Sequence, residues 1–200
     1  MRETYSSTVA VGAGKRVADW LPALYLGLII IVSCAACLLP IELFLIEIWP
    51  RHGFYSLLLF IAPLVGGSLI GLSLSERYYR IRAFESSGRI YERLGIRFFK
   101  RFVPNGDYIN RLTRHFAPGH RVVHDGGSLA KFEARTEFAE RCHLAGLFLG
   151  LPSAAYALIL GWNGFALWLL LPNITFHLYP FLLQRYTRAR IQKVLERRRK

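Results

Sequence analysis

The chain has 200 residues, of which 53% are hydrophobic, and its formal net charge is +13 at pH 7. That length suits about one domain, but the apolar and the charged residues are concentrated in different stretches, as in a membrane protein with basic flanks. Nucleic-acid-binding modules rarely carry long apolar runs, and no known motif of such a module is present. We therefore exclude a nucleic-acid partner.

Four apolar runs predict membrane-spanning helices, at 20–39, 54–74, 143–160 and 165–183. Each is close to the ~20 residues that a helix needs to cross a hydrocarbon layer. Neither a linker nor a fixed-period repeat divides the chain. The sequence therefore predicts an all-α integral membrane protein with four transmembrane helices, in which residues 1–200 form a single membrane domain.

The distribution of cations predicts the topology. Of the 26 Lys and Arg residues, 25 lie in the segments 1–19, 76–142 and 184–200, and the exception is Arg51. If the N-terminus lies inside and four helices cross, all three segments fall on the cytoplasmic side, as the positive-inside rule requires. We expect a multi-pass protein of the plasma (inner) membrane, with both termini cytoplasmic and membrane lipids as partners.

Between the second and third predicted spans, the basic insertion 76–142 alternates cationic and aromatic residues, as in ERYYRIRAF and IRFFKRF. Two sets of residues have the spacing of a helix face: Tyr78, Ile81 and Phe84, and Tyr91, Leu94 and Phe98. We expect amphipathic helices that lie flat in the membrane interface, with their cations toward lipid phosphates.

A polar stripe leads into the third span. Glu133, Glu137, Glu140 and His143 recur at spacings of three and four, so they lie on or near one face of a helix. The plainest interpretation of Glu140 and His143 is a polar pair that solvates the start of a membrane helix. The stripe could also offer ligands to a metal, but one His on one helix rarely closes a metal site. We expect no metal and no cofactor.

The fourth span differs from a plain lipid-facing helix. Its proline and polar residues include Pro172, Asn173, His177 and Pro180. Polar side chains inside a membrane span are typical of a functional site. The basic tail that follows has three arginines that suit the phosphates of lipids or of a substrate: Arg185, Arg188 and Arg190. The positive-inside rule accounts for the charge of this tail without any binding role.

Three separated segments resemble a known family. They are YERLGIRFFKRFVPNGD at 91–107, AERCH at 139–143 and LYPFLLQRYTRAR at 178–190. In order and spacing they are similar to the glycosyl-4,4'-diaponeurosporenoate acyltransferase family of small bacterial membrane proteins. The named member of that family attaches a fatty acyl chain to the sugar of a carotenoid glycoside. The resemblance implies a membrane-bound acyltransferase with an acyl donor and a lipid-like acceptor.

The family's Glu-x-x-His falls on Glu140 and His143. Thr187 departs from the pattern where the family has Asn, and so does His177, where an Asn often precedes the proline of the last span. These departures leave the acceptor open. Substrate binding is expected at Lys100, Asn173, His177, Gln184, Arg185, Tyr186, Arg188 and Arg190.

Acyl transfer to a hydroxyl needs a base for the proton and a positive group for the oxyanion. His143 is the candidate base, because a neutral imidazole titrates near the working pH. Glu140, one turn earlier, is the candidate partner that holds the tautomer of His143. Arg185 and Arg188 are candidate ligands for a phosphate on the donor or the acceptor.

An alternative function comes from another class: a non-enzymatic membrane scaffold or anionic-lipid-binding protein, whose arginines only hold lipid. A scaffold has no need of Asn173, His177 and Gln184 along one span, whereas an active-site cavity does. The polar content of the last span therefore favours an enzyme. The oligomeric state cannot be read from the sequence.

Overall fold

The computed structural model describes residues 20–36, 61–62, 65–67, 69–70, 73–104, 106–117 and 126–199. Within these ranges every regular element is a helix, which confirms the prediction of an all-helical fold. Predictions that concern 1–19, 37–60 and 118–125, and much of the predicted second span, lie outside the described residues.

The first described helix is Trp20–Ala36. The later elements are α3 (Glu76–Tyr79), α4 (Arg89–Arg93), α5 (Ile96–Phe99), the 3-10 turn η2 (Lys100–Phe102), α6 (Asp107–Phe116), α7 (Gly126–Ile159), α8 (Asn163–Asn173), the π-helical turn η3 (Ile174–Leu178) and α9 (Tyr179–Arg199). The last three run on from one another without a break, so residues 163–199 form a single long rod.

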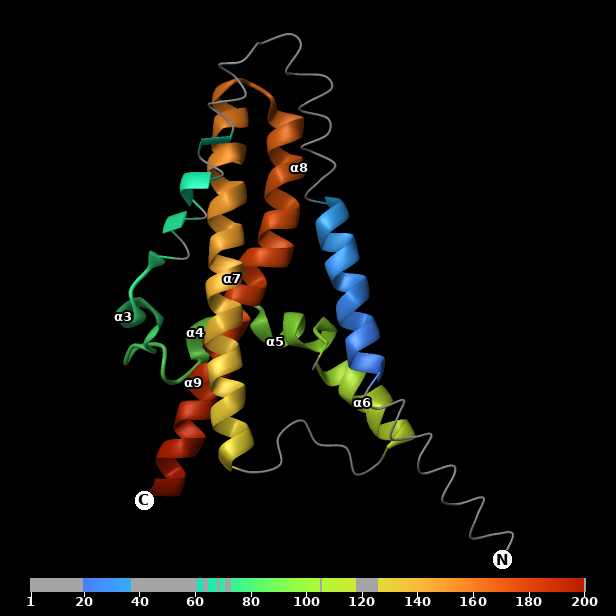
Figure 1. Cartoon of the computed structure of the whole chain (residues 1–200), viewed down its shortest axis with the longest axis vertical. Coiled ribbons are helices and arrows are strands. Elements are labelled where there is room, and N and C mark those ends of the chain that lie inside the picture. Colours follow the sequence, from blue (N-terminus) through green and yellow to red (C-terminus); the bar gives the residue numbers. More distant parts are fainter. Residues whose placement is uncertain are drawn as a thin grey trace, which may run out of the picture.

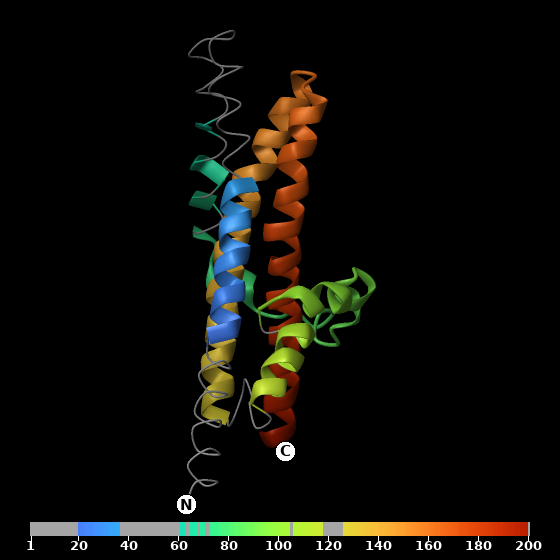
Figure 2. The ribbon, with the colours of Figure 1, turned by 90° about the vertical axis from the view of Figure 1, so that its right-hand side faces the viewer.

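Two long antiparallel rods form the centre of the fold (Figure 1). They are α7 and the continuous α8–η3–α9 segment, which contact each other along their length. A tight turn joins them, in which Gly161 has a positive φ of 76° that residues with a side chain rarely adopt. In both Figure 1 and Figure 2, α4–α6 lie in the half of the molecule away from this turn.

Two helical stretches are long and apolar enough to cross a membrane, Leu129–Ile159 and Asn163–Arg197. They contain the predicted fourth span and the predicted third span up to Ile159. The helix Trp20–Ala36 is apolar but shorter, and Tyr25 of this helix donates a hydrogen bond to the Phe102 carbonyl at 2.6 Å. The described residues thus support two membrane-length helices, and the count of four stays a prediction.

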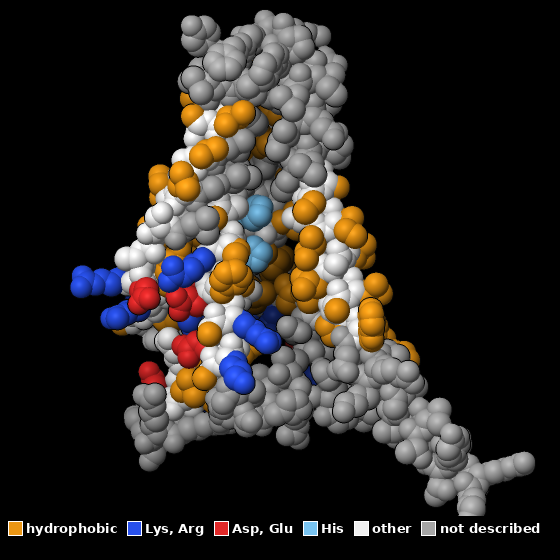
Figure 3. All heavy atoms as spheres, in the orientation of Figure 1, with side chains coloured by type: hydrophobic (Ala, Val, Ile, Leu, Met, Phe, Trp, Pro, Cys, Tyr) orange, Lys and Arg blue, Asp and Glu red, His pale blue; other side chains and the backbone are white. Residues whose placement is uncertain are grey.

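In Figure 3 the charged side chains gather at the lower left of the described surface, and hydrophobic side chains lie above them and along the right side. The histidine side chains on this face lie between the two regions. Such a division is expected where one half meets acyl chains and the other meets headgroups and water.

The predicted amphipathic helices of the insertion are shorter than expected. Helix α3 ends at Tyr79, because Arg80 is extended with ψ of 136°, so Ile81 and Phe84 are not on a helix with Tyr78. Gly95 has a φ of 79° and separates α4 from α5. The expectation of two continuous helix faces was therefore wrong, because glycine and extended residues interrupt the helical period.

The contact between α7 and the α8–η3 segment depends on two small residues of α7. Gly146 lies so close to the ring of His177 that a Cβ at this position would overlap it, and Gly150 lies equally close to the Asn173 amide. Asn173 Nδ2 donates a hydrogen bond to the Gly146 carbonyl at 3.1 Å. Glycines four residues apart allow this approach, as in other membrane helix pairs.

Replacing Gly150 with alanine is therefore expected to destabilise the protein by about 1–3 kcal/mol, the usual cost of overpacking. Asn173 is 4% exposed and has little room to move away. Gly164→Ala is the matched control, since a Cβ at Gly164 meets nothing within 4 Å. The measurement is the thermal denaturation midpoint of the purified chain in detergent. Equal midpoints for the two variants would contradict the packing argument.

Candidate functional site

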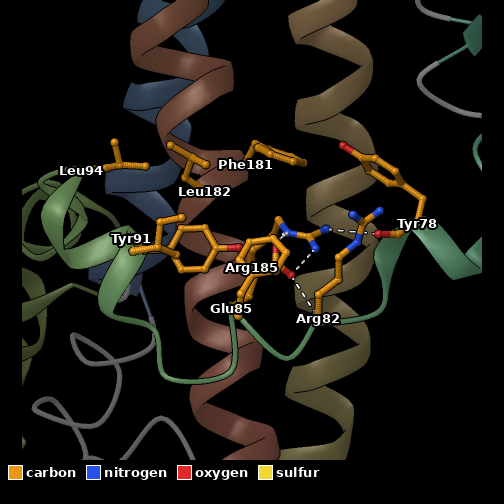
Figure 4. Close-up of a pocket in the computed structure, with 10 residues that line it drawn as sticks. Tyr78, Arg82, Glu85, Tyr91, Leu94, Phe181, Leu182 and Arg185 are labelled. Carbon is orange, nitrogen blue, oxygen red and sulfur yellow. Dashed lines mark hydrogen bonds and ion pairs between the residues drawn. The ribbon is translucent and has the colours of Figure 1, made fainter.

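A buried ion-pair network occupies the region where α9 passes α7 and the loop after α3. Its centre is Arg185, which is 5% exposed. Arg185 Nη1 donates a hydrogen bond to Glu140 Oε1 at 2.7 Å, and Nη2 donates one to Glu85 Oε2 at 2.7 Å. Its Nε lies 3.2 Å from the Tyr91 hydroxyl, as Figure 4 shows. Arg185 is thus bound by two carboxylates, from α7 and from the loop.

Glu140 links Arg185 to a second buried arginine. It is fully enclosed, and its Oε2 pairs with Arg188 Nη2. Arg188 is 2% exposed, and its Nη1 lies 3.8 Å from Glu137 Oε2. Two buried guanidinium groups therefore face two buried carboxylates, those of Glu85 and Glu140, so that this inner set is electrically balanced. Balance of this kind is required because an unpaired charge in a protein interior is costly.

Two residues that contact Arg185, Glu85 and Tyr91, lie outside the membrane-length helices and have shifted pKa values. Burial alone would raise the pKa of Glu85, but the hydrogen bonds from Arg185 and from the Arg82 backbone N–H, with the Arg185 charge, bring this pKa below its ordinary value. Burial raises the pKa of Tyr91 to about 12. Glu85 is therefore a carboxylate and Tyr91 a neutral phenol at neutral pH.

About one helical turn from Glu140 toward the α7–α8 turn, His143 of α7 faces His177 of η3. Their ring centroids are 6.2 Å apart, and the Phe176 backbone lies beside the His143 imidazole. In an α-helix the N–H of residue 180 would donate to the Phe176 carbonyl, but Pro180 has no N–H. A carbonyl left without that donor can accept from an imidazole, and π-helical turns such as η3 are frequent at functional sites.

The structure brings most of the predicted catalytic and tail residues together, although in different pairs from those expected. Both oxygens of Glu140 face arginines, and the described residues contain no hydrogen bond between Glu140 and His143. The Phe176 backbone, rather than the Glu140 carboxylate, lies beside the His143 imidazole. A spacing of three keeps the two residues near one face of α7, but the Glu140 carboxylate is turned toward the arginines of α9.

Asn173 and His177 contribute polar atoms to the same level. Asn173 Oδ1 and His177 Nδ1 are enclosed and have no hydrogen-bond partner in the described part of the chain. Each lies on the face of α8–η3 that packs on the two glycines of α7. Buried polar atoms without partners are uncommon in folded proteins and often mark a functional site.

The remaining predicted residues lie elsewhere. The Tyr186 hydroxyl donates to Glu92 Oε1 at 3.0 Å and accepts from Arg190 Nη1 at 2.8 Å. Lys100 lies on η2, with its Nζ 3.9 Å from Asp107 Oδ1. Gln184 is half-buried on α9. No group of three or more His, Cys, Asp and Glu residues in the described ranges lies where it could hold a metal ion.

Sequence reasoning missed Glu85, which supplies the second carboxylate of the network. A signal was present, because Glu85 is the only acid between Glu76 and Glu92 in a stretch rich in arginine. Tyr91 was taken as an interfacial side chain, whereas it is 4% exposed and its hydroxyl touches Arg185. A lone carboxylate among cations is a reasonable candidate for an internal ion pair.

The fold and the site define an all-helical protein with two membrane-length helices, a buried arginine–glutamate network and a histidine pair beside it. The model of one family, described as glycosyl-4,4'-diaponeurosporenoate acyltransferase, matches residues 75–197, more than half of the chain. The chain therefore belongs to this acyltransferase family. No curated protein and no solved structure matches it.

Proposed function

We propose that the chain is a membrane-bound acyltransferase that moves a fatty-acyl group onto a hydroxyl of a glycosylated or other lipid acceptor. The family supports this class of reaction. The observation that carries the proposal is the His143 imidazole, which lies on a membrane-length helix and faces His177 with ring centroids 6.2 Å apart.

His143 acts as the general base. A neutral imidazole carries a proton on one ring nitrogen and a lone pair on the other, so His143 has a nitrogen available to accept a proton. The acceptor oxygen forms a bond to the acyl carbon while its proton passes to His143. The bond between the acyl group and the donor then breaks, and His143 returns the proton to the leaving group. No net proton is gained or lost.

His177 and Asn173 would form the substrate-facing surroundings of this base. The two residues are one helical turn apart and both pack against α7. His177 Nδ1 is enclosed and has no hydrogen-bond partner in the described residues. We propose that this nitrogen carries no proton, because burying it unprotonated costs less free energy than burying an N–H without an acceptor. The proton is then on Nε2, which can donate to an oxygen of the substrate.

Arg185 and Arg188 are better suited to holding the site together than to binding a phosphate. Their guanidinium groups are enclosed and face Glu85, Glu140 and Glu137. The same observation weakens the alternative of a lipid-binding scaffold, which would depend on exposed cations such as Arg190. We propose that Arg185 and Arg188 position the other residues of the site. We also propose, from the distribution of cations along the chain, that both termini lie on the cytoplasmic side.

The proposal is tested by lipid mass spectrometry of bacterial cells that express the chain and are supplied with glycolipid acceptors. Wild type is expected to produce an acceptor that gains the mass of one fatty-acyl group, and cells with an empty vector are not. Cys142→Ser, a change at an exposed residue next to His143, serves as the matched active control. Identical lipid profiles with and without folded protein would favour the scaffold.

A further inference from the structure

A pocket of about 320 Å³ lies between the loop after α3, helix α4 and helix α9. Its volume falls at the lower end of the ~300–1,000 Å³ typical of ligand pockets. Figure 4 shows two unlike regions: Leu94, Leu182 and Phe181 lie at one end, and Glu85 lies at the other, with the Arg82 side chain extending from beside Glu85 toward Tyr78. Such a division suits a ligand with one apolar and one polar end.

The polar end carries one uncompensated positive charge. Arg185 and Glu85 neutralise each other there, and the second carboxylate bound to Arg185 is shared with Arg188. Arg82 also lines the pocket. Its backbone N–H donates to Glu85, but within the described residues its guanidinium group has no ion-pair or hydrogen-bond partner. The pocket therefore offers a free guanidinium group to an anion.

The apolar end of the pocket is formed by hydrophobic residues of α9 and of the α4 region. Phe181 packs with Leu144, the residue after His143, in a buried cluster, and it follows His177 by four positions on the same rod. Ile90 and Leu94 line the opposite wall and are partly exposed. A hydrocarbon chain that begins at Arg82 and passes Phe181 would therefore run toward the histidine pair.

We propose that this pocket binds the head and first methylene groups of a phosphate-headed amphiphile, with Arg82 on the phosphate. Guanidinium groups match phosphate oxygens in geometry and charge, and the apolar wall accounts for the preference for a chain over free phosphate. The proposal concerns binding alone and does not require acyl transfer. Arg82, rather than the enclosed Arg185 or Arg188, is the cation available to such a ligand.

The test is a binding measurement on the purified full chain in dodecyl maltoside, a neutral detergent with its own alkyl chain. The probe is a fluorophore-labelled dodecyl phosphate, followed by anisotropy and displaced with unlabelled dodecyl phosphate. Arg82→Gln is expected to weaken binding about tenfold or more, because a hydrogen bond to a charged group is lost. Leu94→Glu, which adds a negative charge to the apolar wall, is expected to weaken it as well.

Arg77→Gln is the matched control, since Arg77 is an exposed arginine on α3 that does not line the pocket. Its affinity should equal that of wild type, and circular dichroism should show that all variants keep their helices. Three results would overturn the proposal: no binding of the probe by wild type, unchanged affinity in Arg82→Gln, or displacement of the probe by inorganic phosphate as effective as that by dodecyl phosphate.

Discussion

Replacing His143 with alanine is expected to lower the rate of acyl transfer by about 10²- to 10⁴-fold, the usual contribution of a general base. The variant removes the imidazole that faces His177. His143 belongs neither to the buried ion pairs nor to the buried hydrophobic clusters, so the helices should remain assembled. The measurement is the initial rate of acyl transfer by purified protein in vesicles.

Cys142→Ser is the control for this experiment, because it alters the neighbouring exposed residue without touching the imidazole. It should retain the wild-type rate. A His143→Ala variant that elutes as a folded protein and transfers acyl groups at the wild-type rate would remove His143 from the mechanism. His177 would then be the next candidate for the base, since it is the other ring at this level.

Replacing Glu140 with glutamine is expected to destabilise the protein by about 3–5 kcal/mol, the cost of leaving a buried charge without its partner. Glu140 is 0% exposed and pairs with both Arg185 and Arg188. Arg185 would keep Glu85, but Arg188 would keep only the more distant Glu137 carboxylate, at 3.8 Å. The thermal denaturation midpoint in detergent and the yield of folded protein should both fall.

Glu137→Gln is the matched control on the same helix, because the Glu137 side chain is 41% exposed and pairs with Arg141, and Arg188 keeps its closer partner Glu140 in this variant. Its cost should stay below about 1 kcal/mol, as for other surface pairs. The double variant Glu140→Gln with Arg188→Gln should be more stable than Glu140→Gln alone, since the unpaired buried guanidinium is gone.

This experiment also separates two roles for Glu140. If Glu140→Gln kept the wild-type midpoint and lost transfer, the carboxylate would act on the substrate or on His143, as the Glu-x-x-His spacing first suggested. If stability and transfer fell together and the double variant recovered part of the stability, Glu140 would be a positioning residue. The distances of the Glu140 oxygens from the two arginines favour the second result.

The sequence alone was sufficient for the helical class and for several of the residues that the structure brings together. Long apolar runs are a local property, and they predicted the membrane-length parts of α7 and of the α8–α9 rod. The resemblance to the acyltransferase family placed Glu140, Arg185 and Arg188 in one functional set, and these three residues do lie together. The proline and polar residues that distinguish the last span in the sequence lie within or beside the π-helical turn.

Only the tertiary structure decided how these residues pair. Glu85 and Arg185 are 100 positions apart, and no helical period or turn signal connects residues at such a distance. The approach of α7 to the α8–η3 segment at Gly146 and Gly150 sets which side chains meet. Glu140 accordingly faces two arginines, whereas His143 faces His177. Partner choice depends on the packing of whole helices, because each buried charge must find an opposite charge within the protein interior.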